Sequence, residues 1–195
     1  MKQMLMKIIE DISTFFCEYA GAGAKVAAVV VVVYWCALFV WKRCSAKAVL
    51  SGKQVVVKSF FLFLLVMYGY IVVGITILSR SESGTRYAYF ELFRTFQNTF
   101  QAKKQIYENI LLFMPYAVLL FGLGKCFRRG WLMFGIGVCS SLAIEVTQWG
   151  THTGYFELDD IWTNVLGMMV AYIGCIVISG FVRRWNSKLD AKARG

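Results

Sequence analysis

Charge, proline and histidine are all scarce in this sequence of 195 residues, and each shortage narrows what the protein can be. Charged residues make up 16% of the chain, whereas soluble domains carry about a quarter. One histidine and one proline leave little room for histidine-based catalysis or a histidine-rich metal centre. The six cysteines have no CxxC spacing, which argues against a zinc site and against a disulfide framework.

Hydrophobic residues, by contrast, make up 58% of the chain, and its mean hydropathy is +0.59. A helix needs roughly 20 apolar residues to cross the hydrocarbon core of a membrane. Five segments come near that length, at 26–41, 59–78, 110–126, 131–149 and 161–182. The sequence therefore predicts an all-α fold: a polytopic helical membrane bundle of about five transmembrane helices.

The net charge of +10 could indicate nucleic-acid binding, but the positions of the charges argue against it. Basic residues are concentrated in 41–58, in 124–130 and after residue 182, where apolar runs end, while 150–160 is acidic. The positive-inside rule places the basic segments in the cytoplasm. We therefore predict an N-terminus outside and a cytoplasmic C-terminus, although the segment 79–108, predicted outside, holds five basic residues against three acids.

Two further segments are amphipathic rather than uniformly apolar. Apolar side chains recur at helical spacing from Leu5 to Tyr19, with charged residues between them. A second stripe contains Phe90, Phe93, Phe96 and Phe100. Such segments are typical of helices that lie at the membrane interface or pack on the helix bundle.

Glu145 is the one ionisable residue well inside a predicted span. Ser141 and Gln148 lie four residues before it and three after it, so all three share a helical face. A carboxylate in a membrane is costly and is by default a functional candidate. The alternative is that Glu145 only joins helices, paired with one of Arg80, Arg86 or Arg94.

Two other segments bring polar residues to span ends. Asp159 and Asp160 precede the last apolar run, and Asn164 lies one turn further on. Capping of the helix N-terminus would explain one of the aspartates. Asn109 begins the third span, and we expect Pro115 to kink it, since proline removes a backbone N–H.

These polar residues map to the same ends of spans three, four and five, which the predicted topology places outside. We therefore predict one ligand-binding or functional polar cluster, made of Asn109, Ser141, Glu145, Gln148, Asp159, Asp160 and Asn164.

Three motifs resemble those of the VanZ-like family of bacterial membrane proteins. They are N-x-L-L-F-x-P at 109–115, S-x-x-x-E-x-x-Q at 141–148 and D-D-I-x-x-N-x-x-G at 159–167. The resemblance covers about 77–174. A further family segment, which usually contains proline, corresponds to FELFRTF here, and this stretch lacks the proline. The resemblance implies a link to glycopeptide resistance of the teicoplanin type.

On this basis the chain divides into three parts. Residues 1–58 hold an amphipathic helix, the first span and a basic cytoplasmic loop; 59–182 form the VanZ-like transmembrane domain; and 183–195 are a basic cytoplasmic tail. We expect a multi-pass protein of the bacterial plasma membrane.

We expect its partners to be membrane lipid and a cell-envelope amphiphile, which would be a lipid-linked peptidoglycan precursor or a lipoglycopeptide, with no nucleic acid. No cofactor is predicted. The alternative is a membrane-embedded enzyme acting on a lipid-linked substrate. In that case the carboxylates and amides would hold a divalent cation through oxygen ligands, or one carboxylate would act as general base.

Overall fold

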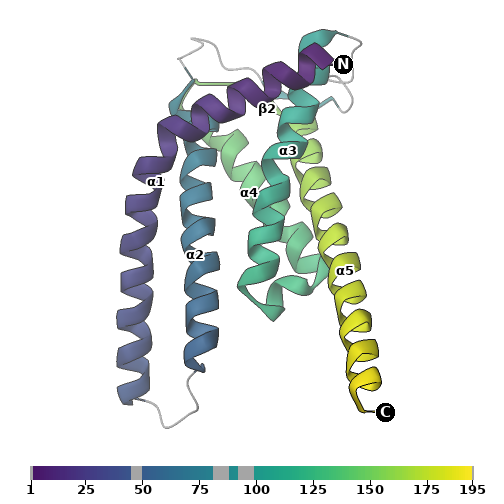
Figure 1. Cartoon of the computed structure of the whole chain (residues 1–195). Coiled ribbons are helices and arrows are strands. Elements are labelled where there is room, and N and C mark those ends of the chain that lie inside the picture. Colours follow the sequence, from purple (N-terminus) through teal and green to yellow (C-terminus); the bar gives the residue numbers. More distant parts are fainter. Residues whose placement is uncertain (1, 45–49, 81–87, 92–98, 195) are drawn as a thin grey trace.

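Long helices dominate the computed structural model, which describes all residues except 1, 45–49, 81–87, 92–98 and 195 (Figure 1). The described chain contains α1 (Lys2–Cys44), α2 (Gly52–Val73), α3 (Phe100–Leu123), α4 (Gly130–Gly150) and α5 (Leu158–Arg194). A π-helical segment, Gly74–Leu78, continues α2, and a 3₁₀ turn, Lys125–Arg128, joins α3 to α4. The short strands β1 (Ala88–Tyr89) and β2 (Phe156–Glu157) pair in parallel.

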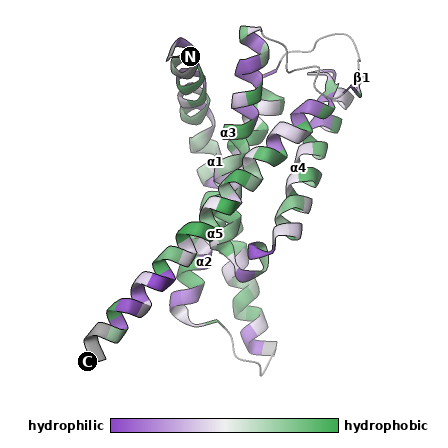
Figure 2. Cartoon of the chain, turned by 90° about the vertical axis from the view of Figure 1, so that its right-hand side faces the viewer, coloured by the Kyte–Doolittle hydropathy of each residue, from purple (hydrophilic) through white to green (hydrophobic). Residues whose placement is uncertain are grey.

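Within the described residues, five helices are long and apolar enough to cross a membrane. Large apolar side chains remain exposed along their outer faces, for example Val29 and Phe39 of α1 and Ile178 of α5. Figure 2 shows apolar residues along the middle of the bundle and hydrophilic residues toward its two ends. The predicted all-α membrane bundle is thus confirmed, and the chain is a multi-pass membrane protein.

Two helices extend well beyond the predicted spans. α3 begins at Phe100, where the Thr99 hydroxyl accepts a hydrogen bond from the Ala102 backbone N–H at 3.3 Å. α5 continues through the basic tail to Arg194. The added residues are rich in Lys, Arg, Gln and Ala, which favour helix. Hydropathy detects only the apolar part of such a helix, so the predicted spans are shorter than the helices.

The predicted amphipathic segment and first span form one continuous helix, α1. In Figure 1 this helix bends, and its N-terminal part crosses one end of the bundle. Ile8 is 1% exposed there, and Asp11 pairs with Lys104 of α3 at 2.7 Å. This amphipathic segment therefore packs on the bundle. Two of the four residues of the second stripe, Phe93 and Phe96, lie outside the described residues.

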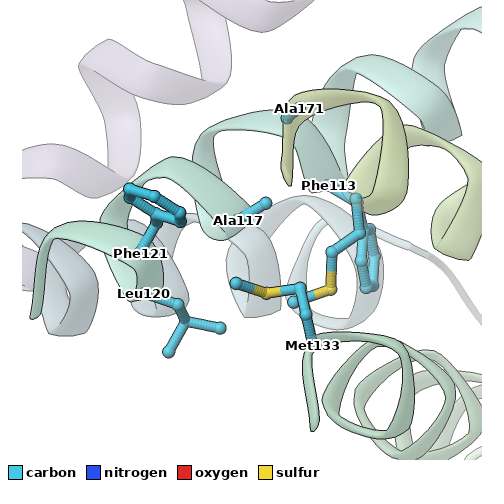
Figure 3. Close-up of a cluster of buried hydrophobic side chains, with 7 residues drawn as sticks. Phe113, Ala117, Leu120, Phe121, Met133 and Ala171 are labelled. Carbon is cyan, nitrogen blue, oxygen red and sulfur yellow. The ribbon is translucent and has the colours of Figure 1, made fainter. Parts of the chain in front are cut away.

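The apolar core lies between α3, α4 and α5 and brings their polar ends together. Figure 3 shows the side chains of this core, which are Phe113, Ala117, Leu120, Phe121, Met133, Met168 and Ala171. Gly167 of α5 packs directly on the Ile110 carbonyl of α3, and an added Cβ there would overlap it. Small residues allow this close approach of two helix backbones in a membrane.

Candidate functional site

Polar side chains gather at the end of the bundle that the N-terminal part of α1 crosses. Here α2 and α4 end, and α3 and α5 begin (Figure 1). Six of the seven predicted site residues are buried, and Asn109 is half-buried. We call the seven the polar cluster: Asn109, Ser141, Glu145, Gln148, Asp159, Asp160 and Asn164.

Glu145 joins α4 to the connection that leads into α5. Its side chain is 2% exposed, and its Oε2 accepts a hydrogen bond from the Glu157 backbone N–H at 3.0 Å. The pairing of β1 with β2 sets Glu157 opposite Tyr89. Glu145 also interacts electrostatically with Asp160, Arg80 and Glu157. The intramembrane acid is therefore part of a group of charges and not an isolated carboxylate.

Asp160 is held by an amide from α3 that the sequence did not single out. Gln105 Nε2 lies 2.9 and 3.0 Å from the two carboxylate oxygens of Asp160 and 3.2 Å from Glu157 Oε2. Gln105 precedes Asn109 by four residues, so both side chains lie on one face of α3. The Gln105 amide group therefore links two carboxylates and holds Asp160 in position.

Each predicted amide of the cluster joins two segments that are far apart in the sequence. Asn109 donates to the Thr163 hydroxyl at 3.2 Å, and Asn164 donates to the Ser141 hydroxyl at 2.8 Å. Gln148 donates to the Thr76 carbonyl at 2.8 Å. That carbonyl lies in the last turn after α2, where helix carbonyls lack a partner within the helix. These bonds hold α2, α3, α4 and α5 together.

One buried hydrogen-bond acceptor of the cluster has no donor within the described chain. Asn164 Oδ1 is buried and has no hydrogen-bond partner within the described chain. A buried polar atom without a partner costs free energy. A donor from outside the chain would therefore be favourable at this position.

Arg80 is a cation that acts on two of the buried carboxylates. It interacts electrostatically with both Glu145 and Asp160. A Cβ added at Gly154 would lie 3.2 Å from Arg80 Nη1 and 3.3 Å from Gln148 Oε1, so the guanidinium lies beside the cluster. Arg86 and Arg94, the other predicted partners, are outside the described residues.

The interpretation of one of the two aspartates as the N-cap does not match the structure. α5 begins at Leu158, so Asp159 and Asp160 both lie inside its first turn and neither precedes the helix. The positive end of the helix dipole still favours negative charge at these positions. Asp159 and Asp160 are nonetheless 2% and 8% exposed, which is unusual for surface caps.

A polar cavity of about 420 Å³ adjoins the cluster. It lies between the N-terminal part of α1, the end of α2 and the start of α3, and its wall includes Arg80, Lys104, Gln105 and Asn109. Lys104 bonds to Asp11 at 2.7 Å and to Glu108 at 3.1 Å, which fixes α1 over this cavity. Gln105 and Asn109 thus face the cavity and also contact the buried cluster.

An apolar groove of about 350 Å³ lies beside the polar cavity, between α2, α3 and α4. Its wall includes Val72, Val73, Phe113 and Ile144. Leu112 lines both spaces, so they adjoin along α3. A polar cavity next to an apolar groove is the shape that an amphiphile requires.

The cation site of the enzyme alternative would combine carboxylate and amide oxygens from the part of the chain that the structure describes. There, no group of three or more His, Cys, Asp or Glu side chains is placed to hold a metal ion. The buried carboxylates instead accept hydrogen bonds from Gln105 and from a backbone N–H.

Comparison with protein families decides the identity. The sequence profile of the VanZ/LLP1 family matches residues 55–179, which is more than half of the chain. The chain belongs to the VanZ/LLP1 family. Neither the curated proteins nor the solved structures include a significant match.

The three sequence motifs of this VanZ/LLP1 protein all lie within the matched range and supply the whole polar cluster. The fold brings the motifs together from α3, α4 and α5 at one end of the bundle. The sequence did not reveal Gln105, Thr163, Thr76 or Glu157, which are the partners of the cluster residues. Helical spacing from Asn109 is the signal that points to Gln105; the other partners follow from packing between segments.

Pro115 of this VanZ/LLP1 protein lies within α3, and the helix continues through it. Near the proline, the Tyr68 hydroxyl of α2 donates to the Leu112 carbonyl at 2.6 Å. Outside partners of this kind allow a proline within a membrane helix. Among the described side chains, the five cysteines are free thiols.

Proposed function

We propose that this VanZ/LLP1 protein binds a cell-envelope amphiphile in a polar cleft at the outer leaflet of the bacterial plasma membrane. The candidates are a lipid-linked peptidoglycan precursor and a lipoglycopeptide. The observation that carries the proposal is the polar cavity, which contacts the buried cluster through Gln105 and Asn109 and shares Leu112 with the apolar groove.

The head group of the ligand is recognised in two steps. It first meets Arg80, Lys104, Gln105 and Asn109 on the cavity wall. Cationic or hydrogen-bonding groups then bind Asp160 beside the Gln105 amide, which holds this carboxylate in place, and a charged donor forms a strong hydrogen bond to a carboxylate. In this arrangement Glu145, Asp159 and Asp160 supply the negative charge, and Asn109, Gln148 and Asn164 orient the ligand.

The apolar part of the ligand occupies the groove between α2, α3 and α4. Its wall is formed mainly by aliphatic and aromatic side chains, among them Val72, Val73 and Phe113. The acyl chain of a lipid already lies in the bilayer, so the groove binds it through van der Waals packing and not through transfer from water. Both parts of an amphiphile would then be bound by one protein at one end of the bundle.

The biological role that we propose is teicoplanin-type glycopeptide resistance or maintenance of the cell envelope. Membership of the family supports this role. An outer-leaflet site suits both candidates, because lipoglycopeptides act outside the cell and lipid-linked precursors are used there.

Ligand binding by the purified protein tests the proposal. Gln105→Leu removes the amide at Asp160, and we expect the dissociation constant for the lipid-linked precursor or the lipoglycopeptide to rise at least about tenfold. Gln101→Leu, one turn earlier in α3 and exposed, is the matched control and should leave binding unchanged.

A second variant tests the groove. Val73→Trp places a large ring at an exposed position of the groove. It should weaken the binding of a lipoglycopeptide that has an acyl chain, and it should leave the binding of the same glycopeptide without the chain unchanged. Equal binding by the wild type and Gln105→Leu would contradict the proposal. Release of a defined product that requires both Glu145 and Asp160 would replace it with the enzyme alternative.

A further inference from the structure

A second and larger cavity lies at the opposite end of the bundle from the polar cluster. Its volume is about 890 Å³, and it opens between the start of α2 and the connection from α3 to α4. Residues 50–62 form one wall, and residues 122–128 form the other. None of these residues takes part in the polar cluster, the polar cavity or the apolar groove.

Four cations line this cavity, namely Lys53, Lys58, Lys125 and Arg128, and no acidic residue lines it. We call it the basic pocket. Lys104, which pairs with Asp11 and Glu108, lies at the other end of the bundle. No acidic side chain among the residues that line the basic pocket balances its positive charge.

Lys58 shows why that imbalance matters. It lies in the second turn of α2, and its half-buried side chain lines the pocket together with Val57 and Leu62. A cation in such surroundings is costly unless an anion or water reaches it. A long lysine can extend to the interface, which relieves part of the cost. An anionic group held in the pocket would balance the charge directly.

The remainder of the pocket wall is apolar, as a lipid requires. Tyr34, Val57, Leu62, Leu123 and Phe127 lie beside the four cations. A free anion would gain nothing from these side chains, whereas the first part of an acyl chain would pack on them. The charge distribution predicts that this end of the protein faces the cytoplasm, where the membrane surface is rich in anionic lipid.

We infer that the basic pocket binds the phosphate-bearing head group of an anionic phospholipid, with its glycerol and upper acyl chain against the apolar wall. This lipid is a structural partner of the protein and is distinct from the amphiphile proposed for the polar cleft. The two inferences rest on different residues, so either one can fail alone.

Native mass spectrometry of the full-length protein in mixed micelles tests the pocket. The probes are phosphatidylglycerol and phosphatidylcholine with identical acyl chains. The double variant Lys53→Gln with Lys125→Gln changes two exposed pocket cations and should not disturb folding. We expect phosphatidylglycerol affinity to fall roughly fivefold for each cation removed.

A charge-matched control distinguishes binding in the pocket from general electrostatic attraction between the protein and anionic lipid. Lys42→Gln with Arg184→Gln removes the same charge at the same end of the bundle, from exposed positions outside the pocket. This control should change the affinity for phosphatidylglycerol by less than about twofold, since its cations lie outside the pocket. The double variant Lys53→Arg with Lys125→Arg keeps the charge and should bind phosphatidylglycerol as the wild type does. Equal losses in the two double glutamine variants, equal binding of phosphatidylcholine, or displacement of the lipid by millimolar inorganic phosphate would each overturn the inference.

Discussion

The residues of the polar cluster could serve to join helices or to form a binding site, and the two interpretations predict different effects of a substitution. The hydrogen bonds of Asn109, Gln148 and Asn164 join helices, as expected of structural polar residues in a membrane. The unpartnered Asn164 Oδ1 and the adjoining polar cavity instead indicate a site. The decisive residues are Glu145 and Asp160, because a carboxylate can be neutralised without a change of shape.

We predict that Glu145→Gln abolishes function while the protein still inserts and folds. The amide oxygen of glutamine can still accept from the Glu157 N–H, and neutralisation removes repulsion from Asp160 and Glu157. The free energy of unfolding should therefore change by no more than about 1 kcal/mol. Resistance to teicoplanin-type antibiotics, membrane abundance and thermal stability are measured side by side.

The double variant Glu145→Gln with Asp160→Asn sharpens this test. Groups that act as one site are strongly non-additive, so the double variant should be barely worse than either single variant. Asp190→Asn, at an exposed position of α5 far from the cluster, is the control and should behave as the wild type. Normal function of Glu145→Gln at normal abundance would show that Glu145 only joins helices.

At the scale of helices, one close contact sets the geometry of the site. Gly167 of α5 packs on the Ile110 carbonyl of α3, one residue after Asn109. Three residues before Gly167, Asn164 reaches Ser141 of α4. The α3–α5 approach thus positions hydrogen bonds that link three helices.

Gly167→Ala tests that contact. An added Cβ would overlap the Ile110 carbonyl and force the helices apart, and overpacking of this kind costs about 1–3 kcal/mol. We expect a lower thermal unfolding temperature in detergent. Gly174→Ala is the matched control, because nothing lies within 4 Å of a Cβ there. Alanine favours helix over glycine, so the control should be as stable as the wild type or more stable.

The same comparison of helices shows what the sequence could and could not predict. Long apolar runs revealed the spans, and the i, i+4, i+7 spacing correctly placed Ser141, Glu145 and Gln148 together on one face of α4. Hydropathy missed the polar helical turns at 100–109, where Gln105 lies. The contacts of Gln148 with Thr76 and of Gln105 with Asp160 join residues more than fifty positions apart, so no local pattern could indicate them.

For the whole molecule, the two ends of the bundle differ in chemistry. The polar-cluster end holds the buried acids Glu145, Asp159 and Asp160, and the opposite end holds the basic pocket. The positive-inside rule predicts that the basic end is cytoplasmic. Both proposals depend on this orientation, since it decides which leaflet each site faces.

Labelling of single cysteines in intact cells tests the orientation. The six natural cysteines are first replaced by serine, a background that should keep full function because their spacings indicate neither disulfide nor zinc. Thr151→Cys, in the acidic connection between α4 and α5, should react with a membrane-impermeant thiol reagent. Lys42→Cys, in the last turn of α1, should react only after the cells are opened.

The labelling pattern has consequences that reach both sites. If Lys42→Cys reacts from outside and Thr151→Cys is protected, the polar cleft faces the cytoplasm. An extracellular lipoglycopeptide could then not reach Glu145 or Asp160, and the basic pocket would lie in the outer leaflet. The expected pattern instead places the cleft where lipid-linked precursors and lipoglycopeptides meet the membrane, with the four pocket cations on the side where anionic lipid is abundant.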